Sequence, residues 1–564
     1  MKFNEYQYVR PNLEVVEAEF SQLLTDFTNA TSFEEQDRVM AAINEVRSEV
    51  ESMRQIVQIR HTIDTTDEFY QEEKSFFDQV GPAYKGLVTN YYQALTQSKF
   101  RAQLEEKWGK QLFLLADSEL KTFSPDVLDD LKEENKLVSE YVKLLAAAKI
   151  EFEGQERNLA QLAAFHQSTD RETRKLSNEA KYAYFVENAD QLDELYDKLV
   201  KVRTTIAEKL GFDSFTELAY ARLKRTDYDA EMVANFRNQV KEYIVPLATK
   251  LREKQQERIG VDSLKYYDVG YSFKTGNPDP KGDAEWIVGQ AKKMYDEMSP
   301  ETEEFYNFML EHNLMDLLSK KGKAGGGYCT YISKYKSPYI FANFNGTKGD
   351  VRVLKHEVGH AFQVYSSRGY EVPEYGFPTL EACEIHSMSM EFFNWPWMDL
   401  FFEEDTDKYK FSHLSEAVQF IPYGVAVDEF QHFVYANPEA TPQERKSAWR
   451  EIEKTYLPHL DYDGNEFLEN GGFWQQQGHI YKVPFYYIDY TLAQICALQF
   501  WKRTQENKDA AWADYLHLCK QGGSKSFTQL VAEANLISPF EEGCVKSVIE
   551  EIEVYLDSIN DKEL

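Results

Sequence analysis

The segment 351–365 constrains the fold most, because an apolar helical pattern there carries two histidines one turn apart. Its apolar residues recur at helical spacing, which predicts a largely buried helix: Val351, Leu354, Val358, Ala361, Phe362 and Tyr365. His356 and His360 lie four residues apart, so both imidazoles point in the same direction from that helix. Buried polar groups without partners are costly, so the two imidazoles must share a ligand or a partner.

Two imidazoles at this spacing suit a zinc ion, which binds histidine nitrogen at about 2.0–2.1 Å. Glu357 follows the first histidine and is offset around the helix, where it can act on a water molecule without competing for the metal. Gly359 costs about 1 kcal/mol relative to alanine in a helix, so we expect a packing or site requirement for it. The five-residue pattern also occurs by chance on exposed helices, but the apolar setting argues against that interpretation here.

A third ligand is expected from the acidic segment 379–391, which predicts a second helix between Pro378 and Asn394. Glu384 follows His360 by 384 − 360 = 24 residues, which leaves room for the first helix to end and the chain to return. Two histidines, one glutamate and an open fourth position are typical of a catalytic zinc site rather than a structural one.

The arrangement resembles the thimet oligopeptidase family of zinc metallopeptidases, and most closely its oligoendopeptidase F and Pz-peptidase branch. The residues that carry the resemblance are His-Glu-x-Gly-His and the later run Glu-Ile-His-Ser-Met-Ser-Met-Glu. The resemblance extends from about Lys149 to the C-terminus and is strongest from Gly325 to Tyr490. In that family the glutamate seven positions before the closing glutamate, Glu391, is the zinc ligand, and this position is Glu384.

The resemblance implies a mainly α fold: a two-lobed helical oligopeptidase with a zincin-type catalytic core. A small β-sheet beside the zinc helix and a deep central channel belong to the same expectation. It further implies one zinc ion as the cofactor and short peptides as substrates, including peptides derived from collagen.

Composition and charge restrict the class of partner. The chain has 564 residues, of which 43% are apolar and 14% aromatic, and this indicates a globular protein with more than one core. Its net charge of −32 argues against nucleic-acid and anionic-membrane partners, which bind basic patches. We therefore expect short peptide substrates, with no nucleic acid, membrane or obligate protein partner.

The expected location is the cytoplasm. The N-terminus has no apolar run behind a basic start, and no stretch approaches the roughly 18 apolar residues of a membrane span. The five cysteines are scattered along the chain, which is typical of a reducing compartment rather than of a disulfide framework.

The chain is expected to divide into a helical N-terminal region, residues 1–202, that forms a channel wall, and a catalytic region, residues 203–564. The two halves interleave in the resembling family. Among the N-terminal helical patterns, the one from Phe69 to Thr96 contains Gly81-Pro82, which predicts a break there. Residues 149–159 predict a short hairpin.

Two short strands are expected just before the zinc helix, at residues 329–332 and 337–344. We expect the strand near Tyr339 to Phe344 to lie at a sheet edge and to pair with an extended peptide. Backbone pairing of this kind does not depend on the peptide sequence, as a peptidase of broad specificity requires.

Residues 471–490 begin with glycines and end in clustered tyrosines, which indicates either an aromatic core or a mobile wall facing the zinc. In the resembling family this region supplies a histidine and tyrosines that bind substrate and stabilise the oxyanion. The resemblance favours His479 and Tyr490 as catalytic residues. Three further tyrosines are expected to bind substrate: Tyr481, Tyr486 and Tyr487.

Together these residues predict zinc-dependent hydrolysis of internal peptide bonds, with Glu357 as general base and a tyrosine hydroxyl stabilising the oxyanion. A metal-bound histidine usually donates its other N–H to a carboxylate, a carbonyl or water. Glu381, one turn before Glu384, is expected to be that carboxylate, unless it is a plain surface residue. Two alternatives stay open: a zinc exopeptidase, whose fixed charge for a peptide terminus the sequence does not locate, and a non-catalytic peptide-binding protein.

Overall fold

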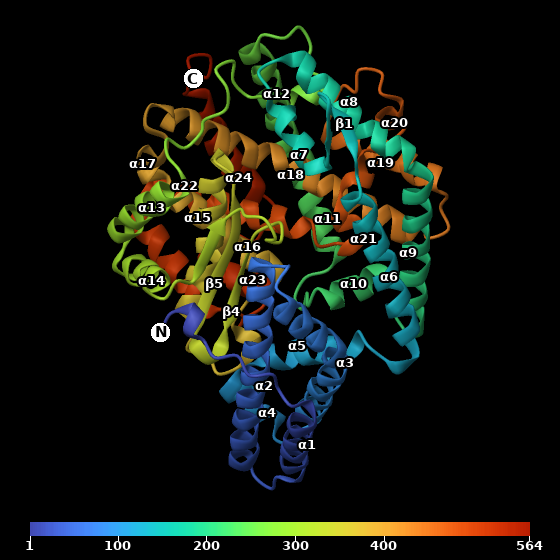
Figure 1. Ribbon diagram of the computed structural model, residues 1–564, viewed down its shortest axis with the longest axis vertical. Coiled ribbons are helices and arrows are strands. Elements are labelled where there is room, and N and C mark those ends of the chain that lie inside the picture. The colour runs from blue at the N-terminus through green and yellow to red at the C-terminus, as the bar shows by residue number, and fades with distance from the viewer.

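The computed structural model describes residues 1–564, apart from the side chain of Lys348. The chain is mainly helical and divides into an N-terminal lobe and a larger part that carries the sheets (Figure 1). Among the described residues, none of the helices combines the length and the apolar character that a bilayer-spanning segment needs.

The N-terminal lobe, shown in blue in Figure 1, has an apolar core of its own. Its helices are α1 (Leu13–Asn29), α2 (Phe33–Ile63), α3 (Glu68–Thr96), α4 (Arg101–Trp108) and α5 (Lys110–Lys121). Val372 and Tyr375 join this core from outside the lobe. Next to them, Arg47 on α2 forms a buried ion pair with Glu374 at 2.5 Å. The loop around residue 374 therefore attaches the lobe to the rest of the molecule.

Helix α3 runs through Pro82 without the predicted break. Proline removes the hydrogen bond to the carbonyl group four residues earlier, which here is that of Asp78. Asp78 lies on the exposed face, where water can satisfy this carbonyl. The opposite face of the helix buries Phe77 and Tyr91, so packing holds both halves of α3 in line.

The larger part has one extended core, to which segments from Phe3 to Leu556 contribute. Its first helices are α6 (Leu128–Ala146), α7 (Leu159–Ala163), α8 (Arg171–Glu187), α9 (Ala189–Lys209), α10 (Phe215–Arg222), α11 (Ala230–Gln239) and α12 (Val245–Ile259). Helices α6 and α9 share this core with helices that follow residue 203. The division of the chain at residue 202 stays a prediction.

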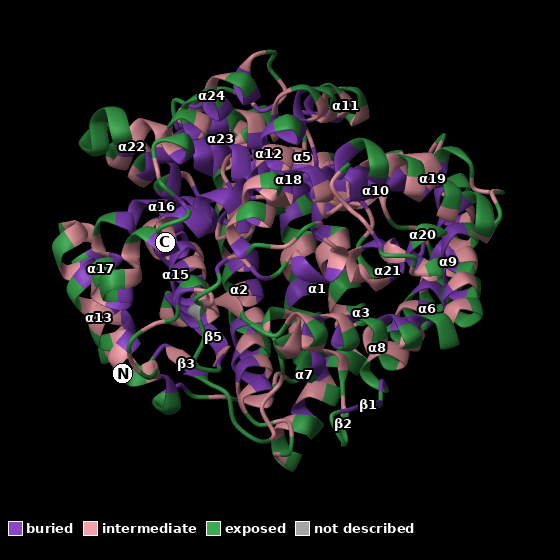
Figure 2. Ribbon diagram, turned by 90° about the horizontal axis from the view of Figure 1, so that it is seen from above, coloured by how far each residue is buried: buried purple, intermediate pink, exposed green. Residues whose placement is uncertain are grey.

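The remaining helices complete the larger part and include the two that carry the predicted metal ligands. They are α13 (Ala284–Met298), α14 (Pro300–Glu311), α15 (Lys348–Ser367), α16 (Leu380–Phe393), α17 (Asp399–Phe402), α18 (Thr406–Ala436), α19 (Pro442–Tyr456), α20 (Glu466–Glu469), α21 (Gly478–Lys482), α22 (Ile488–Gln521), α23 (Phe527–Glu533) and α24 (Cys544–Asp557). Buried residues, purple in Figure 2, concentrate in this set of helices, above all in α16 and α18. The two helices predicted around the metal ligands are α15 and α16.

Helices α15 and α16 touch backbone to backbone at Gly359. A Cβ atom at this position would lie 2.6 Å from the Cα atom of Ser387 and 2.7 Å from the carbonyl oxygen of His386. Any larger residue would force the two helices apart, which close-packed interiors do not tolerate. The expected packing requirement for Gly359 is therefore confirmed, and it brings the two ligand-bearing helices together.

Two small sheets accompany the helices. The predicted hairpin is formed by β1 (Ile150–Phe152) and β2 (Gln155–Arg157), which pair antiparallel. The sheet beside α15 has the order β3-β5-β4, with β3 (Met315–Leu318), β4 (Tyr328–Ile332) and β5 (Ser337–Phe344).

The strand expected to pair with a peptide is not at an edge of this sheet. β5 contains residues 339–344 and pairs with β3 on one side and with β4 on the other. β5 is therefore the middle strand of this sheet, and the prediction that it lies at an edge was wrong. Among the described strands, the outer strand that follows the glycines at 325–327 is β4.

Candidate active site

His356 and His360 on α15 and Glu384 on α16 converge on one point. Nε2 of His356 lies 3.2 Å from Oε2 of Glu384, and Nε2 of His360 lies 3.7 Å from the same oxygen. One nitrogen or oxygen atom from each of the three residues lies within 4.8 Å of the others. Two imidazoles and one carboxylate form a donor set that suits zinc and leaves a fourth coordination position open.

A chain of hydrogen bonds orients His356. Trp395 donates its indole N–H to Nδ1 of His413 at 2.9 Å, so His413 carries its proton on Nε2. That Nε2–H donates to one oxygen of Glu391 at 2.9 Å. The other oxygen of Glu391 accepts from Nδ1 of His356, also at 2.9 Å. In the neutral imidazole this bond places the ring proton of His356 on Nδ1, which leaves Nε2 free to bind a metal.

Glu391 takes the role that was predicted for Glu381. The Glu381 side chain is fully buried, so it is not a surface residue, and it accepts a hydrogen bond from Tyr228 at 3.2 Å. Burial raises the pKa of Glu381 above its ordinary value. Glu391 lies two helical turns after Glu384 and so shares its face of α16, a spacing that could have identified it from the sequence.

Glu357 is a buried carboxylate with an unused oxygen beside the ligand cluster. Its exposed fraction is 8%, and its Oε2 has no hydrogen-bond partner among the described residues. Burial raises the pKa of Glu357 to about 7. Its other oxygen lies 3.5 Å from the position that a Cβ atom would take on Gly327, just before β4. The carboxylate therefore lies between the metal ligands and the outer strand of the sheet.

The ligand cluster opens into a cavity of about 760 Å³. His356 lines this cavity together with His479, Tyr487 and Tyr490, three of the residues predicted from the tyrosine-rich segment. Gln477 donates an amide N–H to Nδ1 of His479 at 2.7 Å, which places the ring proton of His479 on Nε2.

Tyr486 approaches the metal ligands from the same segment. Its hydroxyl group lies 3.5 Å from Oε1 of Glu384, and its ring centroid lies 5.0 Å from that of Tyr490. The structure thus places Tyr486 near the metal ligand Glu384, in contact with Tyr490, which lines the cavity.

Tyr481 does not belong to the site. Its side chain is fully buried, stacked on Tyr141 with ring centroids 3.9 Å apart, and its hydroxyl group donates to the carbonyl of Leu192. The prediction that Tyr481 binds substrate was therefore wrong. For Tyr481, the other interpretation of residues 471–490, an aromatic core, is the correct one.

Arg225 anchors the tyrosine segment and was not found from the sequence. Its guanidinium group donates to the carbonyl of Phe485 at 2.7 Å and to the carboxylate of Asp489 at 2.6 Å. Phe485 has a φ of 66°, an uncommon conformation for a bulky residue that costs roughly 1–3 kcal/mol. The contacts of Arg225 hold this turn, which sets the direction of the following tyrosines. No local pattern marks Arg225, because 260 residues separate it from Phe485.

Comparison with known proteins places the chain in a family. Residues 3–123 match the profile of the peptidase M3 N-terminal domain, and residues 164–282 and 290–548 match that of peptidase family M3. The chain belongs to peptidase family M3. The predicted family and the predicted mainly α oligopeptidase fold are therefore confirmed, and the expected enzyme class, a peptidase, is that of the family.

This M3 peptidase is similar to the solved structure of PZ peptidase A with inhibitor 2, at 65% identity and a TM-score of 0.93 over 100% of both chains. It is 26% identical to the oligoendopeptidase F homolog of Borreliella burgdorferi over 64% of this chain. The match covers 61% of the length of that relative. Oligopeptidase PepF of Bacillus subtilis is 21% identical over 96% of this chain and 82% of its own length.

Proposed function

We propose that this M3 peptidase is a zinc-dependent oligoendopeptidase that hydrolyses internal bonds of short peptides. The observation that carries the proposal is the convergence of the three ligand residues next to a cavity that His356 lines, with the unpartnered carboxylate of Glu357 following the first of them on α15. The donor set suits zinc, and the orientation of His356 by Glu391 supports the same assignment. The name of one relative, oligopeptidase, supports short peptides as the substrate class. Peptides derived from collagen are the narrower proposal, which the resemblance alone suggests.

Each residue of the site then has a defined task. His356, His360 and Glu384 would hold the zinc ion, which would supply a Lewis acid for the peptide carbonyl and for the attacking water. Glu357 accepts the proton of the attacking water through its unpartnered Oε2 and returns it to the leaving amine. The hydroxyl group of Tyr490 donates a hydrogen bond to the developing oxyanion, and the Nε2–H of His479 can donate a second one.

The peptide lies extended along β4, the outer strand of the sheet. A strand added there gains backbone hydrogen bonds that do not depend on its sequence. Helix α2 of the N-terminal lobe covers this strand, because Thr62 hydrogen bonds to Tyr328 at 2.6 Å and Thr330 donates to Gln55 at 2.8 Å. We propose that the lobe thereby forms the outer wall of a channel that admits extended peptides and excludes folded proteins.

One cleavable sequence in two contexts tests this function: a free short peptide, and the same residues in an exposed loop of a stable protein. We expect cleavage of the free peptide alone, at internal bonds read by mass spectrometry. Equal cleavage in both contexts would replace the channel with an open cleft, and removal of terminal residues alone would favour an exopeptidase.

Metal analysis tests the ligand assignment separately. About one zinc per chain is expected, and Glu384→Ala should lose far more zinc than Glu381→Ala, because only Glu384 contributes to the ligand cluster. A His356→Ala variant that stays fully loaded with zinc would contradict the site.

A further inference from the structure

Arg252 on α12 lies on the wall of the active-site cavity, and no carboxylate of the described residues other than Glu416, considered below, acts on its charge. Its Nη1 donates to Oε1 of Gln255 at 2.7 Å and to the carbonyl of Val269 at 3.1 Å. Its Nε is buried and has no hydrogen-bond partner among the described residues. Buried charges in proteins are normally paired, so this arginine in a cavity wall requires an explanation.

His459 adds a second unused nitrogen to the same wall. It lines the cavity, and its Nδ1 is buried without a hydrogen-bond partner among the described residues. Burial, assisted by the charge of Arg252, lowers the pKa of His459 to about 3, so its imidazole is neutral at physiological pH. A neutral imidazole can donate one hydrogen bond to an anion that the guanidinium group attracts.

The nearby acidic residue of the cavity already has a partner. Glu416 forms an ion pair with Arg352 at 3.9 Å, and Arg352 also lies 3.4 Å from Glu391. Burial lowers the pKa of Arg252 to about 10, against the effect of the Glu416 charge. Arg252 therefore stays cationic at neutral pH, although the protein as a whole carries a net charge of −32.

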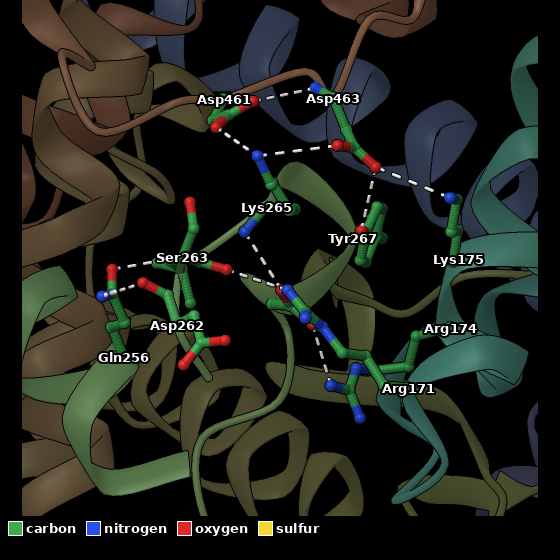
Figure 3. A network of polar contacts seen from close by, with 12 residues as sticks. Arg171, Arg174, Lys175, Gln256, Asp262, Ser263, Lys265, Tyr267, Asp461 and Asp463 are labelled. Carbon is green, nitrogen blue, oxygen red and sulfur yellow. Dashed lines mark hydrogen bonds and ion pairs between the residues drawn. The ribbon is translucent and has the colours of Figure 1, made fainter. Parts of the chain in front are cut away.

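The loop of residues 260–283, between α12 and α13, forms the adjoining part of the wall. A network of charged residues fixes this loop (Figure 3). Lys265 bonds to Asp461 at 2.6 Å and lies 3.5 Å from Asp463. Asp268, which is fully buried, accepts from Arg171 at 2.6 Å and from Arg174 at 2.8 Å.

These contacts attach the loop to α8 and to the segment 461–463. The same loop contributes four residues to the cavity wall that Arg252 also lines: Val269, Gly270, Ser272 and Asn277. Asn277 is itself fixed, because its amide donates to Gln167 at 3.1 Å and its oxygen accepts from the N–H of Ser272. The surroundings of Arg252 are thus ordered before any ligand arrives, which reduces the entropic cost of binding one.

We propose that Arg252, with His459 beside it, binds a carboxylate group of the peptide substrate. The inference rests on the proposed peptidase function and adds a specificity site to it. A guanidinium group recognises carboxylates with directional, charge-assisted hydrogen bonds. The carboxylate is either the C-terminus of the peptide or an acidic side chain. If it is the C-terminus, the enzyme selects peptide length by measuring from that end.

Binding measured without chemistry tests the proposal. A Glu357→Gln variant is titrated calorimetrically with one short peptide, as the free acid and as the C-terminal amide. We expect the free acid to bind about 10- to 100-fold more tightly, the range of hydrogen bonds to charged groups. A parallel pair of amidated peptides that differ by glutamate or glutamine tests the side-chain source.

Substitutions on α12 then assign the effect to one residue. In the Glu357→Gln background, Arg252→Met should abolish the preference for the carboxylate, and Arg252→Lys should restore part of it. Arg258→Met is the matched control, because Arg258 contacts the same loop through the carbonyl of Ser272 at 2.7 Å. It is not among the described residues that line this cavity, so its variant should keep the preference.

The outcomes separate the two proposals. Equal affinity for both members of both peptide pairs would overturn the carboxylate site, as would a preference that persists in Arg252→Met. A preference for glutamate alone that Arg252→Met removes would support the site and identify an acidic side chain as its ligand. If the zinc-loaded wild-type enzyme cuts none of the peptides, the proposed peptidase function fails, and the calorimetry still decides the carboxylate site.

Discussion

The N-terminal lobe and the helix pair α15–α16 bury different kinds of side chain. The core of the lobe is mainly apolar, with residues such as Phe20, Met40 and Phe113 around a few buried amides such as that of Gln36. Its ion pair of Arg47 with Glu374 lies where the lobe meets the rest. Helix α16, in contrast, buries Glu384 and Glu391 among its apolar residues.

Buried polar groups cost free energy unless they find partners, and on α16 these partners are other residues of the site. In the lobe, buried side chains therefore mainly stabilise the fold. On α16, buried side chains also hold the reactive groups of the site in position. The comparison predicts that substitutions in the two regions affect different measurements.

The largest effect is expected for Glu357→Gln. Loss of the general base should lower turnover by about 10²- to 10⁴-fold, because glutamine cannot accept the proton of the attacking water. Zinc content and thermal unfolding should stay unchanged, since the substitution preserves the shape of the side chain. Near-normal turnover in a zinc-loaded variant would assign the base to another residue and weaken the contrast between the regions.

Phe113→Ala in the lobe should have the opposite effects, with stability lowered and catalysis unchanged. Removal of a fully buried ring is expected to cost about 3–5 kcal/mol of stability. Below the unfolding transition, kcat per folded molecule and zinc content should match the wild-type enzyme. Urea unfolding and a peptide assay on one preparation measure both quantities, and a parallel loss of zinc would show that the two regions are not separate in function.

Tyr490→Phe sharpens the comparison within the active site. Loss of one preorganised oxyanion donor should lower turnover by roughly 10²- to 10³-fold, with zinc content unchanged. Tyr486→Phe is the companion variant, because its hydroxyl group lies near Glu384. If Tyr490→Phe turns over normally and Tyr486→Phe does not, the donor is Tyr486.

Glu391→Gln should have the smallest effect of the four. The variant weakens the hydrogen bond that orients His356, so zinc affinity should fall by about 10- to 100-fold. Glu381→Gln is the matched control on the same helix, because its partner is Tyr228 rather than a metal ligand. Competition with a zinc chelator measures both affinities, and equal losses would mean that Glu391 acts through the fold of α16 alone.

The sequence by itself determined the local parts of this protein. The helix that carries His356 and His360, the helix that carries Glu384 and the strands before them were predicted, because helices and strands repeat at fixed spacings. The same spacing placed Glu357 beside the ligands. The resemblance to a known family supplied the overall fold, and it directed attention to the segment of His479 and Tyr490.

The tertiary structure decided everything that depends on contacts between distant segments. It showed that β5 is an inner strand and β4 an outer one, that Tyr481 is buried, and that Arg225 holds the turn at Phe485. It also replaced Glu381 with Glu391 and revealed Arg252 on the cavity wall, with an Nε that has no hydrogen-bond partner among the described residues. A residue's burial and its partners depend on which segments pack against it, and segments hundreds of residues apart leave no periodic signal in the sequence.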